Sequence, residues 1–478
     1  MGLAAVVTLI LGLLRAKAAA VFIGIGGFGF LATFASIQSL FISITGMGMQ
    51  TCGSRSIAMG LAADDPVSAM RSSMVVTRLS LVSGCVGLSV LVLFSELVSQ
   101  WSFGDYSHIL EIISLGVAVF FSNISNGKIA ILQGYSRVTD IARVNSVSAL
   151  VGTSLAVLMY IFLGDNGIIP SLIAMAFIQL IAADIFLRRL SLGKVLMSWQ
   201  ETLLEAKKII PLGIVSMISG FLGSLVTYFT IALLIRSGGS EGVAIYSAAF
   251  ALSAIFVNFV LQAMSMDYFP HLSSLIHDKK STNALINQQT EIGLLLGAPG
   301  ILATVILAKW AITFFYSPAF TSAEILVYWF IVGCLARVIS WPLGYVALAM
   351  GRAKLFLAIE VGFSALHILF VFIGVHFFGA VGAAKAFFLL YVIYIPTIYF
   401  IVNKLTGFSW SDSVKKILII AFLMVLVILS LVQMVNSIYG LVLELAILLC
   451  TCVVFLKMLI FKVGKDHKFF KIFFKFIS

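Results

Sequence analysis

Apolar residues along this chain gather in runs of about twenty, separated by short segments rich in glycine, proline and charge. A helix of ~20 apolar residues crosses the hydrocarbon core of a bilayer. The runs therefore predict about fourteen membrane-spanning helices with short connections. Their expected bounds are residues 3–24, 29–51, 72–97, 108–133, 144–164, 167–187, 209–235, 242–266, 290–316, 322–350, 355–377, 380–402, 415–435 and 438–461.

Composition leads to the same class of protein. The 478 residues are 61% hydrophobic and 10% charged, with a mean hydropathy of +1.15, whereas soluble domains are roughly 25% charged and 45–50% apolar. No soluble core could bury that much apolar surface, so lipid must cover it. We predict an all-α membrane protein. The first apolar run begins at Gly2 without a basic n-region and contains Arg15 and Lys17, which predicts a span rather than a cleavable signal peptide.

Connections that contain lysine and arginine alternate along the chain with connections that contain almost none. If both termini are cytoplasmic, the outer connections contain only Arg236, at a helix edge. The inner connections contain Arg55, Arg71, Arg137, Arg143, Arg188, Arg189, Lys194, Lys207, Lys208, Lys279, Lys280, Arg352, Lys354, Lys404, Lys415 and Lys416. Cytoplasmic loops carry such an excess, so we expect a multi-pass protein of a bacterial inner (cytoplasmic) membrane. The net charge of +11 then reflects orientation and anionic headgroups, and no nucleic-acid partner is expected.

The C-terminal tail is both basic and aromatic. On a helix, its lysines occupy one face and its phenylalanines another, which predicts an interfacial helix on anionic membrane lipids. These residues are Lys468, Lys471, Lys475, Phe469, Phe473 and Phe476. The five cysteines have no CxxC spacing or histidine partners, so they predict free thiols, with neither zinc nor disulfides implied. They are Cys52, Cys85, Cys334, Cys450 and Cys452.

Weak internal repeats divide the chain in two. GGFGFLATF (26–34) and GSEGVAIYS (239–247) are about 213 residues apart, and LGDNG (163–167) and FGAVG (378–382) about 215. A shared offset predicts two pseudo-symmetric six-helix lobes, an arrangement typical of transporters. The expected parts are an N-terminal lobe at 1–190, a cytoplasmic linker at 191–208, a C-terminal lobe at 209–403, two additional helices at 404–461 and an amphipathic tail at 462–478.

On these features the chain resembles the Wzx-type polysaccharide flippases of the multidrug/oligosaccharidyl-lipid/polysaccharide exporter superfamily. The resemblance rests on the fourteen-span plan and on LRAKAAAVFIGIGGFGFLATF (14–34), MDYFPHLSSLI (266–276) and FGAVGAAKAF (378–387). It implies transport, by alternating access, of an undecaprenyl-pyrophosphate-linked oligosaccharide (the O-antigen repeat unit of lipopolysaccharide biosynthesis) from the cytoplasmic to the periplasmic leaflet. It also implies contact with other polysaccharide-assembly membrane proteins.

Charged residues inside the predicted spans are the candidate site. An ionisable group there costs roughly 2.5–3.5 kcal/mol, so it faces a wet cavity or a partner. Arg337 lies mid-span, with Trp341 one turn on and Pro342 next. Its guanidinium could bind phosphate oxygens in a fork while the indole stacks on a sugar. An ion pair with a neighbouring helix is the alternative.

Other cations could act along the same path. Arg15 and Lys17 lie about 200° apart on a helix, so we expect Arg15 to face inward and Lys17 to snorkel or pair. Arg78 and Lys128 could guide an incoming headgroup, although snorkelling explains them equally well. Lys385 could receive the pyrophosphate late in the cycle.

The segment after the eighth span supplies a candidate gate. We expect Pro270 to end that helix and Asp267 to act as a cytoplasmic gate contact. No catalytic residue, metal or cofactor is predicted. Coupling to protons or sodium stays open at four membrane acids, each of which could instead be an ion-pair partner. They are Glu111, Asp184, Glu360 and Glu444.

Two other functions compete with the flippase. A multidrug or cation antiporter of the same superfamily predicts acids in the N-terminal lobe, whereas the central charges here are mainly basic. A polytopic glycan polymerase or ligase is the second alternative. Such enzymes resemble one another in having a long outer loop that carries the reaction, whereas no outer connection here exceeds about a dozen residues. We therefore predict a transporter rather than an enzyme.

Overall fold

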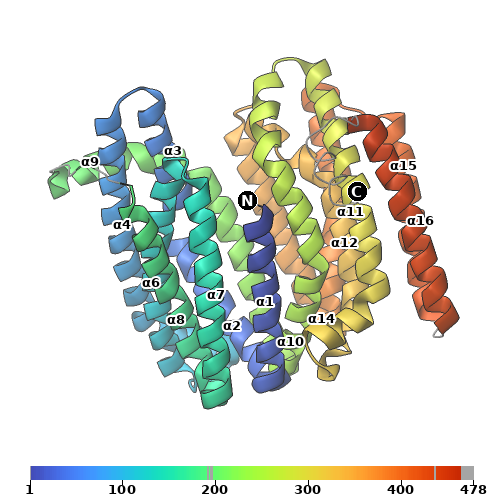
Figure 1. Cartoon of the computed structure of the whole chain (residues 1–478), viewed down its shortest axis with the longest axis horizontal. Helices are drawn as coiled ribbons and strands as arrows, with labels where there is room; N and C mark the ends of the chain where they lie inside the picture. The colour runs from blue at the N-terminus through green and yellow to red at the C-terminus, as the bar shows by residue number, and fades with distance from the viewer. Residues whose placement is uncertain (1, 191–192, 194–196, 435–437, 464–478) are drawn as a thin grey trace. The chain divides into compact units, whose positions relative to one another are not determined.

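The computed structural model describes residues 2–190, 193, 197–434 and 438–463, and within these residues it contains helices and no strand (Figure 1). The predicted all-α membrane class is confirmed. The α-helices are α1 (Gly2–Phe22), α2 (Gly24–Thr45), α3 (Met49–Ala62), α4 (Pro66–Leu93), α5 (Ser95–Phe103), α6 (Ile109–Gly134), α7 (Val138–Leu163), α8 (Ile168–Arg188), α9 (Trp199–Ile209), α10 (Ile214–Leu275), α11 (Lys279–Phe315), α12 (Ala323–Gly344), α13 (Val346–Ala349), α14 (Ala353–Thr406), α15 (Asp412–Met434) and α16 (Ile438–Val463).

The membrane spans agree with the hydropathy pattern. Among the described residues, ten helical stretches are long and apolar enough to cross a bilayer. Three of them, Val138–Arg188, Ile214–Gln262 and Ala353–Thr406, contain 51, 49 and 54 residues. Since one crossing takes ~20 residues, each of these crosses twice. With α1, an apolar helix of 21 residues, the count agrees with the expected fourteen or so.

The chain forms two compact units. Unit 1 comprises Met1–Ser247 with Phe314–Phe320, and unit 2 comprises Ala248–Thr313 with Thr321–Ser478. In unit 1, α4 packs on α6, α6 and α7 pack on α8, and α1 packs on α7. A buried cluster that includes Phe34, Leu115 and Tyr160 fills the space between these helices.

Unit 2 is built around the pairing of α12 with α14. One of its buried clusters joins Tyr268 and Leu272 of α10 to Leu343 of α12 and Ile398 of α14. Lipid covers the remaining apolar faces, because side chains such as Phe372 and Phe400 stay more than half exposed in the protein itself. The predicted lobe bounds at 1–190 and 209–403 stay a prediction. The predictions for Lys194 and for the tail lysines at 468, 471 and 475 concern residues outside the described ones.

Two helix boundaries differ from the expectation. The predicted span 29–51 is interrupted between α2 and α3, where Met47 and Gly48 have φ of +50° and +61°. Pro270 was expected to end its helix, but α10 continues through it to Leu275. Proline removes one backbone hydrogen bond. The burial of Tyr268 and Leu272, on either side of Pro270, stabilises the continuous helix.

The internal repeat is visible in backbone angles. Gly164, before α8, has φ 56° and ψ −133°, and Gly379, within α14, has φ 55° and ψ −138°. Gly24 and Gly239 form a second pair, with φ of +70° and +67°. In both pairs the second glycine follows the first by 215 residues. Only glycine adopts such φ values without strain, so the repeat preserves the reversals between spans.

The reversal at Gly379 brings two backbones together and gives a stability test. A Cβ on Gly382 would overlap the carbonyl of Gly374, whereas a Cβ on Gly362 of the same helix meets nothing within 4 Å. We expect Gly382→Ala to lower the free energy of unfolding by about 1–3 kcal/mol, because the reversal must open. The melting temperature of the purified protein in detergent measures this.

Gly362→Ala is the matched control. It adds a methyl group in open space and should change stability by less than about 1 kcal/mol. Equal melting temperatures for the two variants would contradict the close approach.

Candidate functional site

The sequence-predicted residues are divided between the two units. Unit 1 contains Arg15, Arg78 and Lys128, on α1, α4 and α6. Unit 2 contains Asp267 on α10, Arg337 and Trp341 on α12, and Lys385 on α14. Each residue has a distinct environment.

Arg337 lies in the second half of α12 and is half-buried. Its Nη1 donates a hydrogen bond to Oδ1 of Asn258 on α10, at 3.2 Å. No carboxylate of the described residues forms an ion pair with it. Asn258 is exposed, so this contact orients the guanidinium without neutralising it. A membrane cation held by a neutral partner can accept an anionic ligand.

Aromatic side chains surround the same stretch of α12. The Trp341 ring lies 5.0 Å from the ring of Tyr345 and 5.4 Å from that of Tyr268, between centroids. Tyr268 donates from its hydroxyl to the carbonyl of Pro342 at 2.7 Å, which anchors the end of α12 to α10. Trp341 therefore forms part of an aromatic group with Tyr268 and Tyr345.

Several neighbours of Arg337 were not predicted from the sequence. Asn258 interrupts an apolar run as a lone polar residue (AIFVNFV), a signal that could have found it. The charge of Arg337 also acts on the hydroxyls of Tyr345 and Tyr391, as does the half-buried Glu360 of α14. A cation, a carboxylate and two phenols thus share one region of unit 2. Their proximity depends on the pairing of α12 with α14, which no local pattern encodes.

Arg15 and Lys17 have different partners in unit 1. Arg15 is half-buried, and its Nη1 lies 2.6 Å from the sulfur of Met175 on α8. Lys17 donates from Nζ to the carbonyl oxygen of Tyr316 at 2.7 Å. The chain around Tyr316 is thereby fixed to α1, with the Tyr316 ring edge-on to Phe28 at 5.6 Å.

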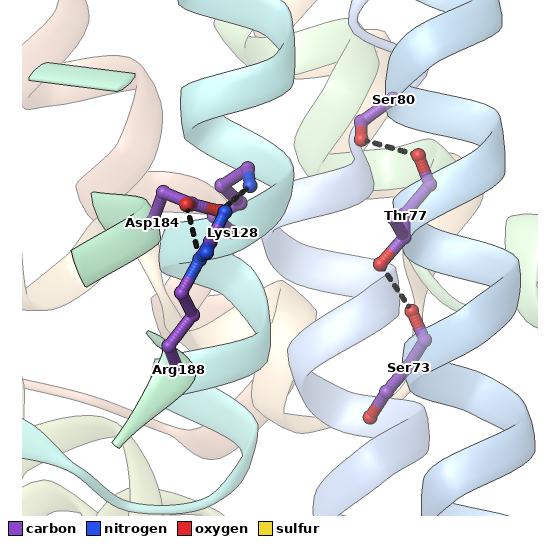
Figure 2. A network of polar contacts seen from close by, with 6 residues as sticks. All are labelled: Ser73, Thr77, Ser80, Lys128, Asp184 and Arg188. Carbon is purple, nitrogen blue, oxygen red and sulfur yellow. Dashed lines mark hydrogen bonds and ion pairs between the residues drawn. The ribbon is translucent and has the colours of Figure 1, made fainter. Parts of the chain in front are cut away.

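Lys128 belongs to a three-residue charge cluster (Figure 2). Its ammonium group forms an ion pair with Asp184 of α8. The other oxygen of the same carboxylate accepts from Nε of Arg188 at 2.6 Å. The side chains of Lys128 and Asp184 are 18% and 29% exposed. Two cations share one acid here, so the cluster keeps one positive charge while binding α6 to α8.

Arg78 binds the backbone before α9. Its guanidinium donates to the carbonyls of Ser198 and Met197 and to Oγ1 of Thr202, at 3.1, 2.8 and 2.7 Å. It also lies 5.0 Å from the ring centroid of Trp199. A capping box between Ser198 and Glu201 begins α9. Hydrogen bonds from Ser198 hold the pKa of the Glu201 carboxyl below its ordinary value.

The last two candidates have contrasting surroundings. The Nζ of Lys385 lies 4.0 Å from the ring centroid of Phe378 and 5.4 Å from that of Trp329, so aromatic faces accommodate the charge. Asp267 is exposed on α10. Arg15 and Arg337 are therefore the two candidates that combine partial burial with a single neutral side chain as hydrogen-bond partner, whereas Arg78 holds α9 and Lys128 is paired.

Known proteins resemble this chain in sequence and in fold. The lipid III flippases of Escherichia coli and Shigella flexneri are each 24% identical to it over 404 residues, which cover 80% of this chain and 92% of theirs. Among solved structures, the lipid II flippase MurJ in an inward closed conformation superposes with a TM-score of 0.71 at 15% identity, covering 97% of this chain and 99% of that one.

A second type of transporter shares the fold. An inward-facing multidrug resistance transporter of the MATE family superposes with a TM-score of 0.60 at 17% identity, covering 85% of this chain and 99% of that one. These likenesses establish a multi-pass, all-α transporter fold. The family described as "Polysaccharide biosynthesis protein" matches residues 20–324. This covers more than half of the sequence, and the chain belongs to that family.

Proposed function

We propose that this protein is a flippase that moves a lipid-linked oligosaccharide across the bacterial inner membrane by alternating access. The lipid III flippase relatives and the family support a role in polysaccharide assembly. The observation that carries the proposal is Arg337, a half-buried cation whose hydrogen-bond partner is the neutral Asn258. The substrate we favour is an undecaprenyl-pyrophosphate-linked O-antigen repeat unit, moved from the cytoplasmic to the periplasmic leaflet.

The chemistry of that substrate accounts for the site. A sugar head cannot cross hydrocarbon unaided, because each buried hydroxyl would lose its hydrogen bonds to water. A pyrophosphate adds negative charge, which a planar guanidinium binds through two parallel hydrogen bonds. The hydrogen bond to Asn258 orients the guanidinium of Arg337, and its charge acts on the phenols of Tyr345 and Tyr391. Arg337 is thus the residue assigned to the pyrophosphate, with Arg15 proposed as a second contact.

A multidrug or cation antiporter is the second candidate function. The MATE-like fold favours it, and Glu360 supplies a half-buried carboxylate that could exchange a proton or a sodium ion. Drug tolerance separates the two functions. We expect expression of this protein to leave drug tolerance of a sensitive host unchanged, and increased tolerance that Glu360→Gln removes would favour the antiporter.

Arg337→Ala is the direct test of the proposed function. We expect it to reduce surface polysaccharide about tenfold or more, since a charged hydrogen bond contributes about 1.5–3 kcal/mol. Arg337→Lys should restore less than about half of the wild-type amount, because an ammonium group lacks the planar fork. The measurement is surface polysaccharide in a host without its own flippase, with protein level checked by immunoblot.

Lys309→Ala is the matched control, since Lys309 is an exposed cation on α11 of the same unit. It should leave surface polysaccharide unchanged. Wild-type polysaccharide from Arg337→Ala, at a normal protein level, would overturn the assignment of Arg337.

The charge cluster in unit 1 gives a separate stability test. Asp184→Asn leaves Lys128 and Arg188 as neighbouring cations without their acid. We expect it to cost about 1–2 kcal/mol, less than the roughly 3–5 kcal/mol of a fully buried pair because the group is partly exposed. Lys128→Met combined with Asp184→Asn should regain part of the lost melting temperature. A double variant no more stable than the single one would contradict the ion-pair account.

A further inference from the structure

An apolar groove runs along α4 in unit 1, outside the candidate site. Its volume is about 370 Å³. It extends from Leu81 to Val90 on one face of α4 and ends against Trp199, the first residue of α9. The hydroxyl of Ser89, the thiol of Cys85 and the indole N–H of Trp199 are the few polar side-chain groups among the residues that line it. Such a lining accommodates a hydrocarbon chain rather than a sugar or a phosphate.

The length of the groove matches one leaflet. The ten residues from Leu81 to Val90 extend over about 14 Å along the helix axis, which is close to half of the ~30 Å hydrocarbon core. Leu81 and Val86 are 46% and 39% exposed, so the groove is open along its side. A single acyl chain of one leaflet therefore fits between α4 and its lipid surroundings.

The helix α9 sets the depth of the groove in the membrane. Thr202, Ala206 and Ile209 face the protein and are buried. Trp199 and Leu203, one turn apart, are 53% and 56% exposed. A short helix with exposed apolar side chains and a charged last turn lies in the plane of the headgroups, and an exposed tryptophan is typical of that level. The groove thus opens directly below the headgroup region.

The mouth of the groove is positively charged. Arg78 uses three of its five donors on Met197, Ser198 and Thr202, at the start of α9. The exposed Arg71 lies two turns earlier on the same face of α4. Both act on Glu201. No acid of the described part of the chain forms an ion pair with either arginine. Two cations beside one carboxylate, above a hydrocarbon groove, complement a lipid with an anionic headgroup.

We infer that the groove between α4 and α9 binds one anionic phospholipid, with an acyl chain against Val86 and Trp199 and the phosphate at Arg71. Arg78 is a positioning residue, because its hydrogen bonds hold Trp199 over the groove. The lipid is distinct from any transported substrate, and the inference does not depend on the proposed function. An anionic lipid bound in this groove contacts α9, the helix that connects α8 to α10.

The native Trp199 provides the assay. The full chain is reconstituted in phosphatidylcholine nanodiscs with increasing fractions of phosphatidylglycerol that carries brominated acyl chains, which quench tryptophan on contact. Subtracting the quenching of Trp199→Phe isolates the signal of Trp199. Its half-quenching should require about fivefold less brominated phosphatidylglycerol than brominated phosphatidylcholine, since one basic residue near the surface contributes about 1 kcal/mol. The exposed Trp101 and Trp310, which remain in the subtracted variant, should show no preference.

Two variants locate the lipid. Arg71→Gln should remove the preference for phosphatidylglycerol, and Val86→Phe should reduce quenching of Trp199 by filling the groove. Val151→Phe, on the exposed face of α7, is the control and should change nothing. Equal quenching by the two lipids, or a preference that Arg71→Gln leaves intact, would overturn the inference. Displacement of the brominated lipid by an equimolar amount of polyprenyl phosphate would assign the groove to a substrate tail instead and would also overturn it.

Discussion

Hydrocarbon cannot solvate charge, and this constraint explains how the structure uses each of its membrane cations. A guanidinium or ammonium group inside a bilayer needs a protein partner, a polar ligand or a path to the headgroups. The chain supplies a different solution in each case. Lys128 shares Asp184 with Arg188, Lys17 donates to a backbone carbonyl, and Lys385 lies against two aromatic rings. Arg337 donates instead to the amide oxygen of the exposed Asn258, and no acid among the described residues shares its charge as Asp184 shares that of Lys128.

That difference separates the cations that bind helices together from the one that we propose binds the pyrophosphate. A paired cation binds helices together and costs stability when its acid is removed. A cation held by an amide remains available to an anion, at an energetic cost to the unliganded protein that the rest of the fold must offset. The aromatic group around Trp341 and the anchoring of Pro342 by Tyr268 keep this part of α12 in place. Unit 2 therefore combines a fixed scaffold with an unneutralised charge.

The sequence predicted the fold well because hydropathy acts locally. Runs of ~20 apolar residues determine where helices cross a membrane, and glycines with positive φ mark the reversals at Gly164 and Gly379. The sequence could not predict what depends on tertiary packing. Helix α10 passes Pro270 because Tyr268 and Leu272 are buried beside it. For the same reason, the partners of the cations were not predictable. Asn258 is 79 residues from Arg337, and Asp184 is 56 from Lys128.

Arg78 illustrates the same limit in another way. Its position near the end of a span suggested contact with a substrate headgroup, but its hydrogen bonds go to Met197, Ser198 and Thr202. Only the folded chain brings α9 to α4. The same contact places Trp199 over an apolar groove, a feature with no signal in the local sequence.

The central claim is that an unneutralised arginine recognises a pyrophosphate. The most direct test compares the affinity of the purified protein for an undecaprenyl-pyrophosphate-linked oligosaccharide with its affinity for the same oligosaccharide on uncharged undecaprenol. The account predicts that the pyrophosphate form binds at least about tenfold more tightly and that this advantage falls as salt rises. Equal affinities for the charged and uncharged lipids would contradict it.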